Sequence, residues 1–284
     1  MPALSRTMEA RYELASILRD ARAEPALPSV NRRCGKMMVV GISDPGFVRE
    51  VVLERDEVVD FAKYPFNIPA VAGLERLRLD PRITILVGEN GSGKSTLIEA
   101  IALAAGFGPE GGTRSLHGTT QASESELHRY LRLVRGARRE KGGFFLRAES
   151  LFNVATRVDA LGLGAYGWES LHEKSHGESF LWLIENRFRP NGLYILDEPE
   201  AALSPQRQLS ALVVMRRLIE AGCQFVMATH SAILMAYPGA LIYRLDGAGM
   251  APVAYEETEH FTVTRGFLLN RESFLKELMR DEDG

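Results

Sequence analysis

The sequence has few cysteines, no long apolar run and no signal-peptide pattern. Its two cysteines, Cys34 and Cys223, stand far apart without metal-binding spacing, so we expect free thiols in a reducing cytoplasm. No apolar run approaches the roughly 20 residues that a membrane-spanning helix needs. The opening stretch, MPALSRTMEARYELASILRD, lacks the apolar core of a secretion signal. We therefore expect a cytoplasmic protein without membrane insertion.

An excess of charge of either sign is also lacking. The 284 residues carry a formal net charge of -3, so any contact with nucleic acid has to come from a local basic patch. The composition, 45% hydrophobic and 25% charged, is ordinary for a globular protein and allows a substantial core.

Residues 1–36 look separable from the rest. A short helix is expected over Thr7–Ala23, and the proline-containing stretch EPALPS ends it. The apolar run MMVV, which begins at Met37, is expected to form a strand. We therefore expect a flexible N-terminal extension followed by one domain over residues 37–284.

From Arg82 onward, short apolar runs alternate with amphipathic segments. The runs ITILVG, GFFLRA, LYILDEPE, QFVMATHS, ALIYRLD and PVAYEET are expected as strands, as is the earlier REVVL. Helices are expected over residues 94–105, 125–135, 178–188, 205–221 and 272–279, and YPFNIPAV is expected to be extended. This alternation predicts an α/β fold with a largely parallel sheet and helices on both faces.

A complete phosphate-binding motif, G-x-x-x-x-G-K-S/T, is present in GENGSGKST. It follows the expected strand ITILV and opens an expected helix, which is the context such a loop requires. Glycines let successive backbone N–H groups turn toward phosphate oxygens; Lys94 is expected to reach the β- and γ-phosphates, and the Ser95 hydroxyl to ligate Mg²⁺. The expected ATP-binding residues are Gly88, Glu89, Asn90, Gly91, Ser92, Gly93, Lys94, Ser95 and Thr96.

Two acids and a histidine follow later strands. LYILDEPE delivers Asp197 and Glu198 to the carboxyl end of a strand, where sheets of this kind bind their ligands. Asp197 is expected to hold Mg²⁺, and Glu198 to act as general base toward the attacking water. His230 follows the strand in MATHS and is expected to sense the γ-phosphate.

The stretch HEKSHGES supports two incompatible interpretations. Its first five residues match H-E-x-x-H, the zinc-peptidase pattern, with His172 and His176 four apart. Its last five, SHGES, look like a degenerate ATPase signature placed before the expected helix ESFLWLIENRF. Glycines on both sides disfavour the continuous helix that a zinc site needs, so the signature interpretation is preferred.

In this order, GENGSGKST, SHGES, LYILDEPE and ATHS resemble the ABC-type ATPase superfamily. The stretch ILVGENGSGKSTLIEAIAL is more similar to the SMC and RecF branch than to transporters. The lead-in YPFNIPAV, the segment FFLRAESLFN and the ending YEETEHFTVTRGFLLN resemble small stand-alone ATPases of that branch. The resemblance implies an ABC-type P-loop fold with a mostly parallel core sheet, antiparallel β elements and a helical lid inserted at about residues 106–190.

The same resemblance implies roles for residues that spacing alone does not assign. Ser175 and Gly177 would approach the γ-phosphate bound to a second subunit, so an ATP-dependent homodimer is expected. Glu149 follows the strand in FFLRAES and takes the place of the glutamine that contacts Mg²⁺ in many relatives. Tyr64 and Phe66 are the candidates for an adenine contact, with core packing as the favoured alternative.

The leading hypothesis is therefore a Mg²⁺-dependent ATPase switch that dimerises around two ATP molecules in nucleic-acid maintenance or defence. The alternative is the motor subunit of an ABC transporter whose membrane chains are separate. Nucleic acid and a partner protein are both candidate ligands. A basic cluster could contact phosphates, although interspersed acids favour a solvated face; it comprises Arg129, Arg132, Arg135, Arg138, Arg139 and Lys141.

Overall fold

The computed structural model describes residues 46–114, 125–147 and 176–279. Contacts between residues divide the chain into two compact units, Ser43–Tyr255 and a smaller one that contains residues 256–279. The boundary expected after residue 36 and the strand expected at Met37 lie outside the described residues.

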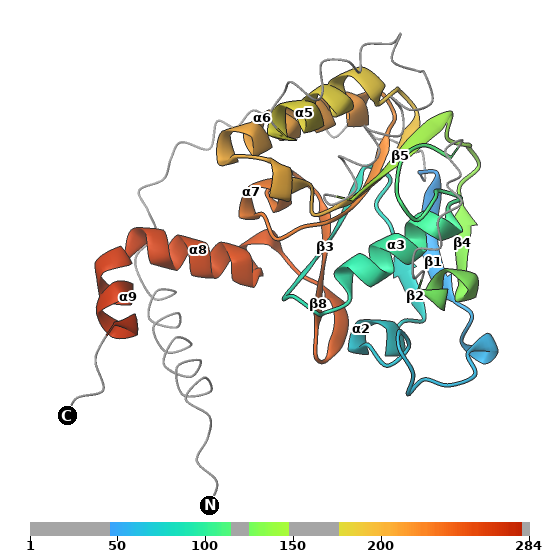
Figure 1. The fold of residues 1–284 in the computed structure, drawn as a ribbon, viewed down its shortest axis with the longest axis horizontal. Helices are drawn as coiled ribbons and strands as arrows, with labels where there is room; N and C mark the ends of the chain where they lie inside the picture. The colour runs from blue at the N-terminus through green and yellow to red at the C-terminus, as the bar shows by residue number, and fades with distance from the viewer. Residues whose placement is uncertain (1–45, 115–124, 148–175, 280–284) are drawn as a thin grey trace, which may run out of the picture. The chain divides into compact units, whose positions relative to one another are not determined.

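A six-stranded sheet forms the centre of the larger unit (Figure 1). Its strand order is β5-β6-β7-β3-β8-β9; the first five strands run parallel, and β9 pairs antiparallel with β8. Every residue of β3, β6 and β7 is buried, as the continuous apolar runs predict. The strands are β3 (Ile83–Gly88), β5 (Gly142–Arg147), β6 (Gly192–Asp197), β7 (Gln224–Ala228), β8 (Leu241–Asp246) and β9 (Gly249–Pro252).

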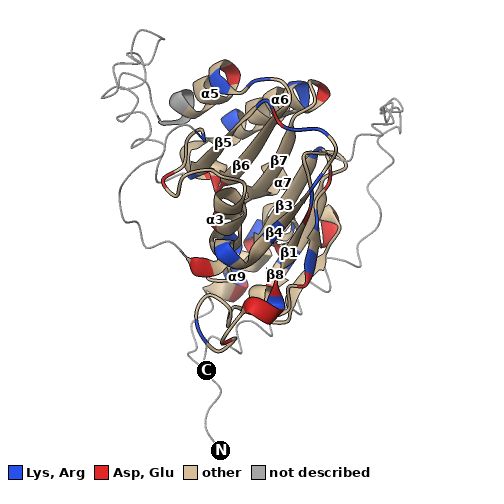
Figure 2. Ribbon diagram, turned by 90° about the vertical axis from the view of Figure 1, so that its right-hand side faces the viewer, with Lys and Arg blue, Asp and Glu red and all other residues tan. Residues whose placement is uncertain are grey.

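Helices and a second sheet cover the two faces of this central sheet. The helices α5 (His176–Arg187), α6 (Pro205–Glu220) and α7 (Ala232–Met235) pack on one face. The helix α3 (Lys94–Ala104) and a three-stranded sheet pack on the other (Figure 2). The expected helices at 94–105, 178–188 and 205–221 are confirmed within one or two residues, and the predicted α/β fold class is confirmed.

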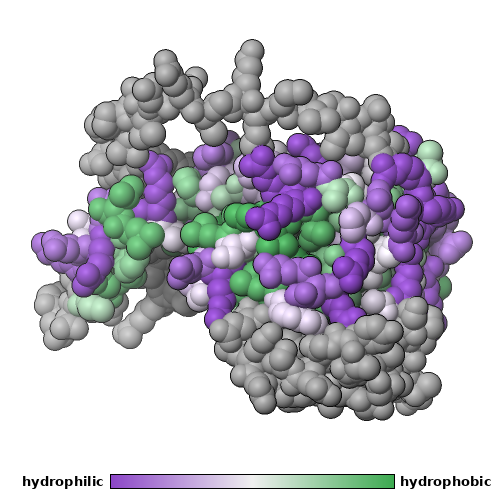
Figure 3. Space-filling view, turned by 90° about the horizontal axis from the view of Figure 1, so that it is seen from above, coloured by the Kyte–Doolittle hydropathy of each residue, from purple (hydrophilic) through white to green (hydrophobic). Residues whose placement is uncertain are grey.

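The outer surface of α6 keeps some apolar side chains in solvent. Leu209 and Val213, one helical turn apart, are 56% and 53% exposed. Figure 3 views this side and shows apolar residues in the middle of the face between hydrophilic ones.

The second sheet corrects one prediction. It is antiparallel with the order β2-β1-β4, and the helix predicted over 125–135 is wrong: the segment forms a 3-10 turn, η2 (Glu126–Tyr130), followed by β4. Ladder pairing with β1 replaces helical hydrogen bonds, and the sequence LRLVR fits a strand with Leu131 buried and Arg132 exposed. The described part of the expected lid therefore contains strands as well as α5. The strands are β1 (Val48–Leu53), β2 (Arg76–Arg78) and β4 (Leu131–Arg135).

Two other predictions are wrong in part. YPFNIPAV is not extended throughout, because Pro69 opens the short helix α2 (Pro69–Ala72) after a cis peptide bond between Tyr64 and Pro65. Only the first residue of PVAYEET, Pro252, belongs to a strand, because β9 ends there and a 3-10 turn follows at η6 (Tyr255–Glu257). A further 3-10 turn, η1 (Arg55–Glu57), follows β1.

The smaller unit contains two helices in its described residues, α8 (Glu259–Leu269) and α9 (Arg271–Leu278). Thr258 caps α8, since its side chain accepts a hydrogen bond from the backbone N–H of Phe261. Phe267 of α8 packs edge-on against Phe274 of α9, with ring centroids 6.0 Å apart. The closing helix expected at 272–279 is confirmed, whereas α8 was not predicted.

Candidate functional site

The glycines of GENGSGKST occupy positions that other residues would strain. Gly88 ends β3 with φ at 153°, and a Cβ there would lie 2.2 Å from the Leu245 carbonyl oxygen. Gly93 precedes α3 with φ at 95°, and a Cβ there would lie 2.6 Å from Ile68. The hydroxyl of Ser92 is buried, and no hydrogen-bond partner reaches it among the described residues. The chain therefore forms the tight strand–loop–helix turn that the motif predicts.

Lys94 lies inside this loop with its side chain buried. Its ammonium donates hydrogen bonds to the carbonyl oxygens of Gly88 and Glu89, both at 2.9 Å, and the residue is 4% exposed. Burial lowers the pKa of Lys94 below its usual value, while the nearby carboxylates of Glu198 and Asp197 act in the opposite direction. The ammonium is therefore held at the loop, in the field of the acids at the end of β6.

Ser95 joins the loop to those acids. Its hydroxyl donates a hydrogen bond of 3.1 Å to the Asp197 carboxylate, across 102 positions in sequence. Asp197 is 7% exposed at the end of β6, and burial raises its pKa to about 6. The hydrogen bond from Ser95 and the charge of Arg147 oppose that rise. A hydroxyl and a carboxylate oxygen, both hard ligands, thus lie together as Mg²⁺ requires.

Glu198 and His230 face each other beside this pair. Glu198 has a left-handed backbone with φ at 49°, which is uncommon for a residue other than glycine, and its N–H donates to the Ala228 carbonyl of β7 at 3.0 Å. The His230 Nε2 and Glu198 Oε1 atoms are 3.6 Å apart, and both side chains are partly exposed. The carboxylate can therefore meet both solvent water and the imidazole.

Glu200 is a site residue that the sequence interpretation missed. It lies in the 3-10 turn η5 (Pro199–Ala202), and its carboxylate accepts a hydrogen bond from the backbone N–H of His230. Its other oxygen is buried without a partner among the described residues. The third acid of DEPE was the available signal, because an acid just after a strand-end pair can reach the loop of the neighbouring strand.

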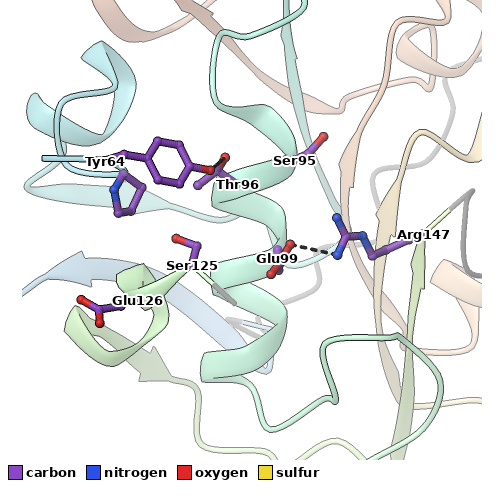
Figure 4. Close-up of a pocket in the computed structure, with 8 residues that line it drawn as sticks. Tyr64, Ser95, Thr96, Glu99, Ser125, Glu126 and Arg147 are labelled. Carbon is purple, nitrogen blue, oxygen red and sulfur yellow. Dashed lines mark hydrogen bonds and ion pairs between the residues drawn. The ribbon is translucent and has the colours of Figure 1, made fainter. Parts of the chain in front are cut away.

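A cavity of about 510 Å³ opens along α3 beside the phosphate loop (Figure 4). Within it, the Tyr64 hydroxyl lies 3.2 Å from the Thr96 hydroxyl, and Arg147 forms an ion pair of 2.9 Å with Glu99. The lining residues are Tyr64, Pro65, Ser95, Thr96, Glu99, Ser125, Glu126 and Arg147.

The two aromatic candidates for an adenine contact, Tyr64 and Phe66, differ in their exposure to solvent. Phe66 is 6% exposed and packs edge-on against Tyr130 with ring centroids 5.0 Å apart, so it belongs to the core. Tyr64 is 66% exposed and lines the cavity.

Not every predicted site residue is brought together. The structure gathers the phosphate loop with Asp197, Glu198 and His230. Gly177 lies in the first turn of α5, which begins at His176. Glu149 and Ser175 lie outside the described residues, so the structure leaves their expected roles as predictions.

The residues of the basic cluster do not lie on one face of a helix, as was expected. Arg132 pairs with Glu54, and Arg135 pairs with the buried carboxylate of Glu140. Because η2, β4 and the turn after it carry these residues, their charges are spread and partly neutralised.

The H-E-x-x-H pattern lies largely outside the described residues, so the structure leaves the zinc interpretation untested. In the described ranges, no group of three or more His, Cys, Asp or Glu side chains is arranged to hold a metal. His172 and Glu173 of the H-E-x-x-H match lie outside those ranges. Among the described helices, none combines the length and apolarity that crossing a membrane requires.

The chain is similar to one protein-family model and to several solved structures. A family model described as an AAA domain matches residues 57–145. No curated protein matches the chain significantly. Among solved structures, the SMC head domain from Thermotoga maritima has 17% identity and a TM-score of 0.42, covering 73% of this chain and 99% of that one.

Two further solved structures are similar at the same level. A metal-chelate-type ABC transporter in an inward-facing conformation has 19% identity and a TM-score of 0.39, covering 69% of this chain and 81% of that one. An Smc head bound to the C-terminal winged-helix domain of ScpA has 11% identity and a TM-score of 0.37, covering 63% and 92%. The AAA-domain match includes the loop from Gly88 to Ser95 and agrees with the resemblance to P-loop ATPases that the sequence predicts.

Proposed function

We propose that this chain is a Mg²⁺-dependent ATPase that works as a switch, pairing with a second copy around two ATP molecules and separating after hydrolysis. The observation that carries the proposal is the hydrogen bond between Ser95 and Asp197, with the Lys94 ammonium in the adjoining loop. These three groups are what a magnesium–triphosphate ligand needs in one place.

The phosphates would bind where the loop turns into α3. Backbone N–H groups and the positive end of the helix favour anions there, and the buried hydroxyl of Ser92 supplies one more donor. Lys94 would exchange its bonds to the Gly88 and Glu89 carbonyls for the β- and γ-phosphate oxygens. The exchange keeps the ammonium paired, which a buried cation requires.

Magnesium fits the oxygen donors of Ser95 and Asp197. When bound, it would neutralise negative charge on the phosphate oxygens. Glu149 remains a proposed additional ligand. The chain's own contribution is to hold the hydroxyl and the carboxylate 3.1 Å apart in a site closed to solvent on the sheet side.

Glu198 is the proposed general base. A water oxygen would attack the γ-phosphorus and form the new P–O bond, its proton would pass to Glu198, and the bond to the bridging oxygen would break to release ADP. His230, 3.6 Å from that carboxylate, would donate a hydrogen bond to the γ-phosphate, and Glu200 would hold its backbone in place.

The pairing step rests on α5. A helix N-terminus attracts anions, and α5 begins at His176, directly after the proposed signature serine. Ser175 and Gly177 would contact the γ-phosphate bound to the second copy. Nucleic acid or a partner protein is the proposed target of the switch, acting in nucleic-acid maintenance or defence.

The test of the proposal is ATP hydrolysis by the purified chain and by Lys94→Ala. Wild type should hydrolyse ATP only with Mg²⁺, and the variant should lose turnover and bind ATP far more weakly. Lys276→Ala, at an exposed position of α9, is the matched control and should behave as wild type. Wild-type turnover in Lys94→Ala would refute the assignment, and turnover stimulated only by membranes carrying a transporter would favour the motor-subunit alternative.

A further inference from the structure

Arg147 stands at the edge of the proposed magnesium site, where no motif placed it. It is the last residue of β5, and its backbone is in register with Asp197 of the neighbouring parallel strand. Neighbouring strands lie about 4.8 Å apart, so the two side chains start from adjacent positions at the same end of the sheet. The charge of Arg147 is close enough to oppose the rise in the pKa of Asp197.

A carboxylate on the opposite wall orients the guanidinium. Arg147 forms an ion pair of 2.9 Å with Glu99, which lies on α3 one helical turn after Ser95, and the Glu99 side chain is only 12% exposed. Figure 4 shows the pair reaching from the strand to the helix. A guanidinium carries five N–H donors in a planar fork, so it can bind two anions at once.

The cavity beside α3 connects this ion pair to the phosphate loop. Ser95, Thr96, Glu99 and Arg147 all line it. Among the described residues in its lining, Arg147 is the single cation, while Glu99 and Glu126 are acids. A polyphosphate entering beside Asp197 and these acids requires compensating positive charge.

We propose that Arg147 is a phosphate-binding residue, positioned by Glu99 and directed at the terminal phosphate of the bound nucleotide. This rests on the proposed function. The terminal phosphate is chosen because Ser95 and Asp197 would hold the magnesium ion that neutralises the transferred phosphate, and Arg147 adjoins Asp197. Arg147 thereby occupies the strand-end place for which Glu149 was expected.

The test compares affinity for ATP and ADP in a background that cannot hydrolyse ATP. With Glu198→Gln present, dissociation constants with Mg²⁺ are measured for Arg147→Met and Arg147→Lys. Loss of a charge-assisted hydrogen bond should weaken ATP binding by about tenfold or more in Arg147→Met and change ADP binding by less than about twofold. Arg147→Lys should lie between, because lysine keeps the charge but not the fork.

Glu99→Gln tests the positioning role. It should produce a smaller ATP-selective loss than Arg147→Met, and adding it to Arg147→Met should cause no further loss, because Glu99 acts through Arg147. An ATP-selective loss that adds in full to that of Arg147→Met would refute positioning.

A matched control comes from another arginine–glutamate pair. Arg76 pairs with Glu50 at 2.6 Å in the second sheet, so Arg76→Met removes a comparable ion pair away from the cavity and should leave both affinities unchanged.

Three results would overturn the inference. Equal losses for ATP and ADP in both Arg147 variants would make the ion pair a structural link between β5 and α3. Unchanged affinities would show that Arg147 does not contact the nucleotide. An ATP-selective loss in Glu149→Gln but not in Arg147→Met would assign the contact with the terminal phosphate to Glu149. If the Glu198→Gln background binds no ATP at all, the proposed function itself fails, which is a distinct outcome.

Discussion

Replacing Asp197 by asparagine should stabilise the nucleotide-free protein at neutral pH while it abolishes hydrolysis. Asp197 is 7% exposed, and burial raises its pKa from 3.8 to about 6, despite the hydrogen bond from Ser95 and the charge of Arg147. Asparagine keeps the size of the side chain and an oxygen that can accept the Ser95 hydrogen bond. It removes the buried negative charge that would bind Mg²⁺ in the proposed mechanism.

The sign and the size follow from proton binding. The folded protein holds the Asp197 proton more tightly than the unfolded chain does, so stability falls as pH rises from 3.8 to about 6. Below pH 3.8 the Asp197 carboxyl does not reduce the stability of the folded protein, and above about pH 6 the reduction is complete. With about 1.4 kcal/mol for each pH unit, the full cost is about 3 kcal/mol, and at about pH 5 roughly half of it applies.

Thermal unfolding without nucleotide at about pH 5 and about pH 8 measures this. For a domain of this size, 1 kcal/mol shifts Tm by roughly 2–4 °C, so Asp197→Asn should melt several degrees above wild type at the higher pH. Its advantage should be roughly half as large at the lower pH. Mg-ATP should raise the Tm of wild type and have much less effect on the variant.

Asp246→Asn is the control, because that carboxylate is 40% exposed on β8 and pairs with Arg244. Asp246→Asn should not raise the Tm above that of wild type at either pH. The reasoning is refuted if Asp197→Asn melts at or below wild type at about pH 8, or if its advantage is the same at both pH values.

Three further predictions concern the remaining groups. Glu198→Gln should bind Mg-ATP without turnover and become dimeric by light scattering, and adding Ser175→Arg should restore the monomer; tight ATP binding without association would disprove the pairing mechanism. Glu200→Ala and His230→Ala should each slow turnover by at least about tenfold, with the double variant no slower than His230→Ala, since Glu200 acts through His230; additive losses in kcat would contradict this. His172→Ala should retain ATPase activity, and elemental analysis finding one zinc per chain, lost in this variant, would restore the peptidase interpretation.

Local sequence was sufficient wherever one continuous segment determines the geometry. The loop from Gly88 to Ser95 was predicted because its glycine spacing only suits a strand–turn–helix junction, and Gly88 has no room for a Cβ. Asp197 and Glu198 were predicted at the end of β6 for the same reason, since a buried apolar run that stops at two acids has to place them at the edge of the sheet.

Local sequence misled where pairing with a distant segment decided the structure. Residues 125–135 show helical periodicity, yet Leu131 to Arg135 form β4 because β1, some 80 positions earlier in sequence, offers an antiparallel edge. A strand gains its hydrogen bonds from its neighbour, so its own residues report only part of the preference.

The sequence alone identified the loop that we propose binds phosphate and the acids that follow β6, because a few adjacent residues form each motif. Only the tertiary structure decided which distant groups complete them. Arg147 meets Glu99 and adjoins Asp197, and Glu200 holds His230, because parallel strands end at one edge of the sheet and α3 packs across it. Charges within a few ångströms in a buried site interact strongly whatever their separation along the chain, and no local pattern records that distance.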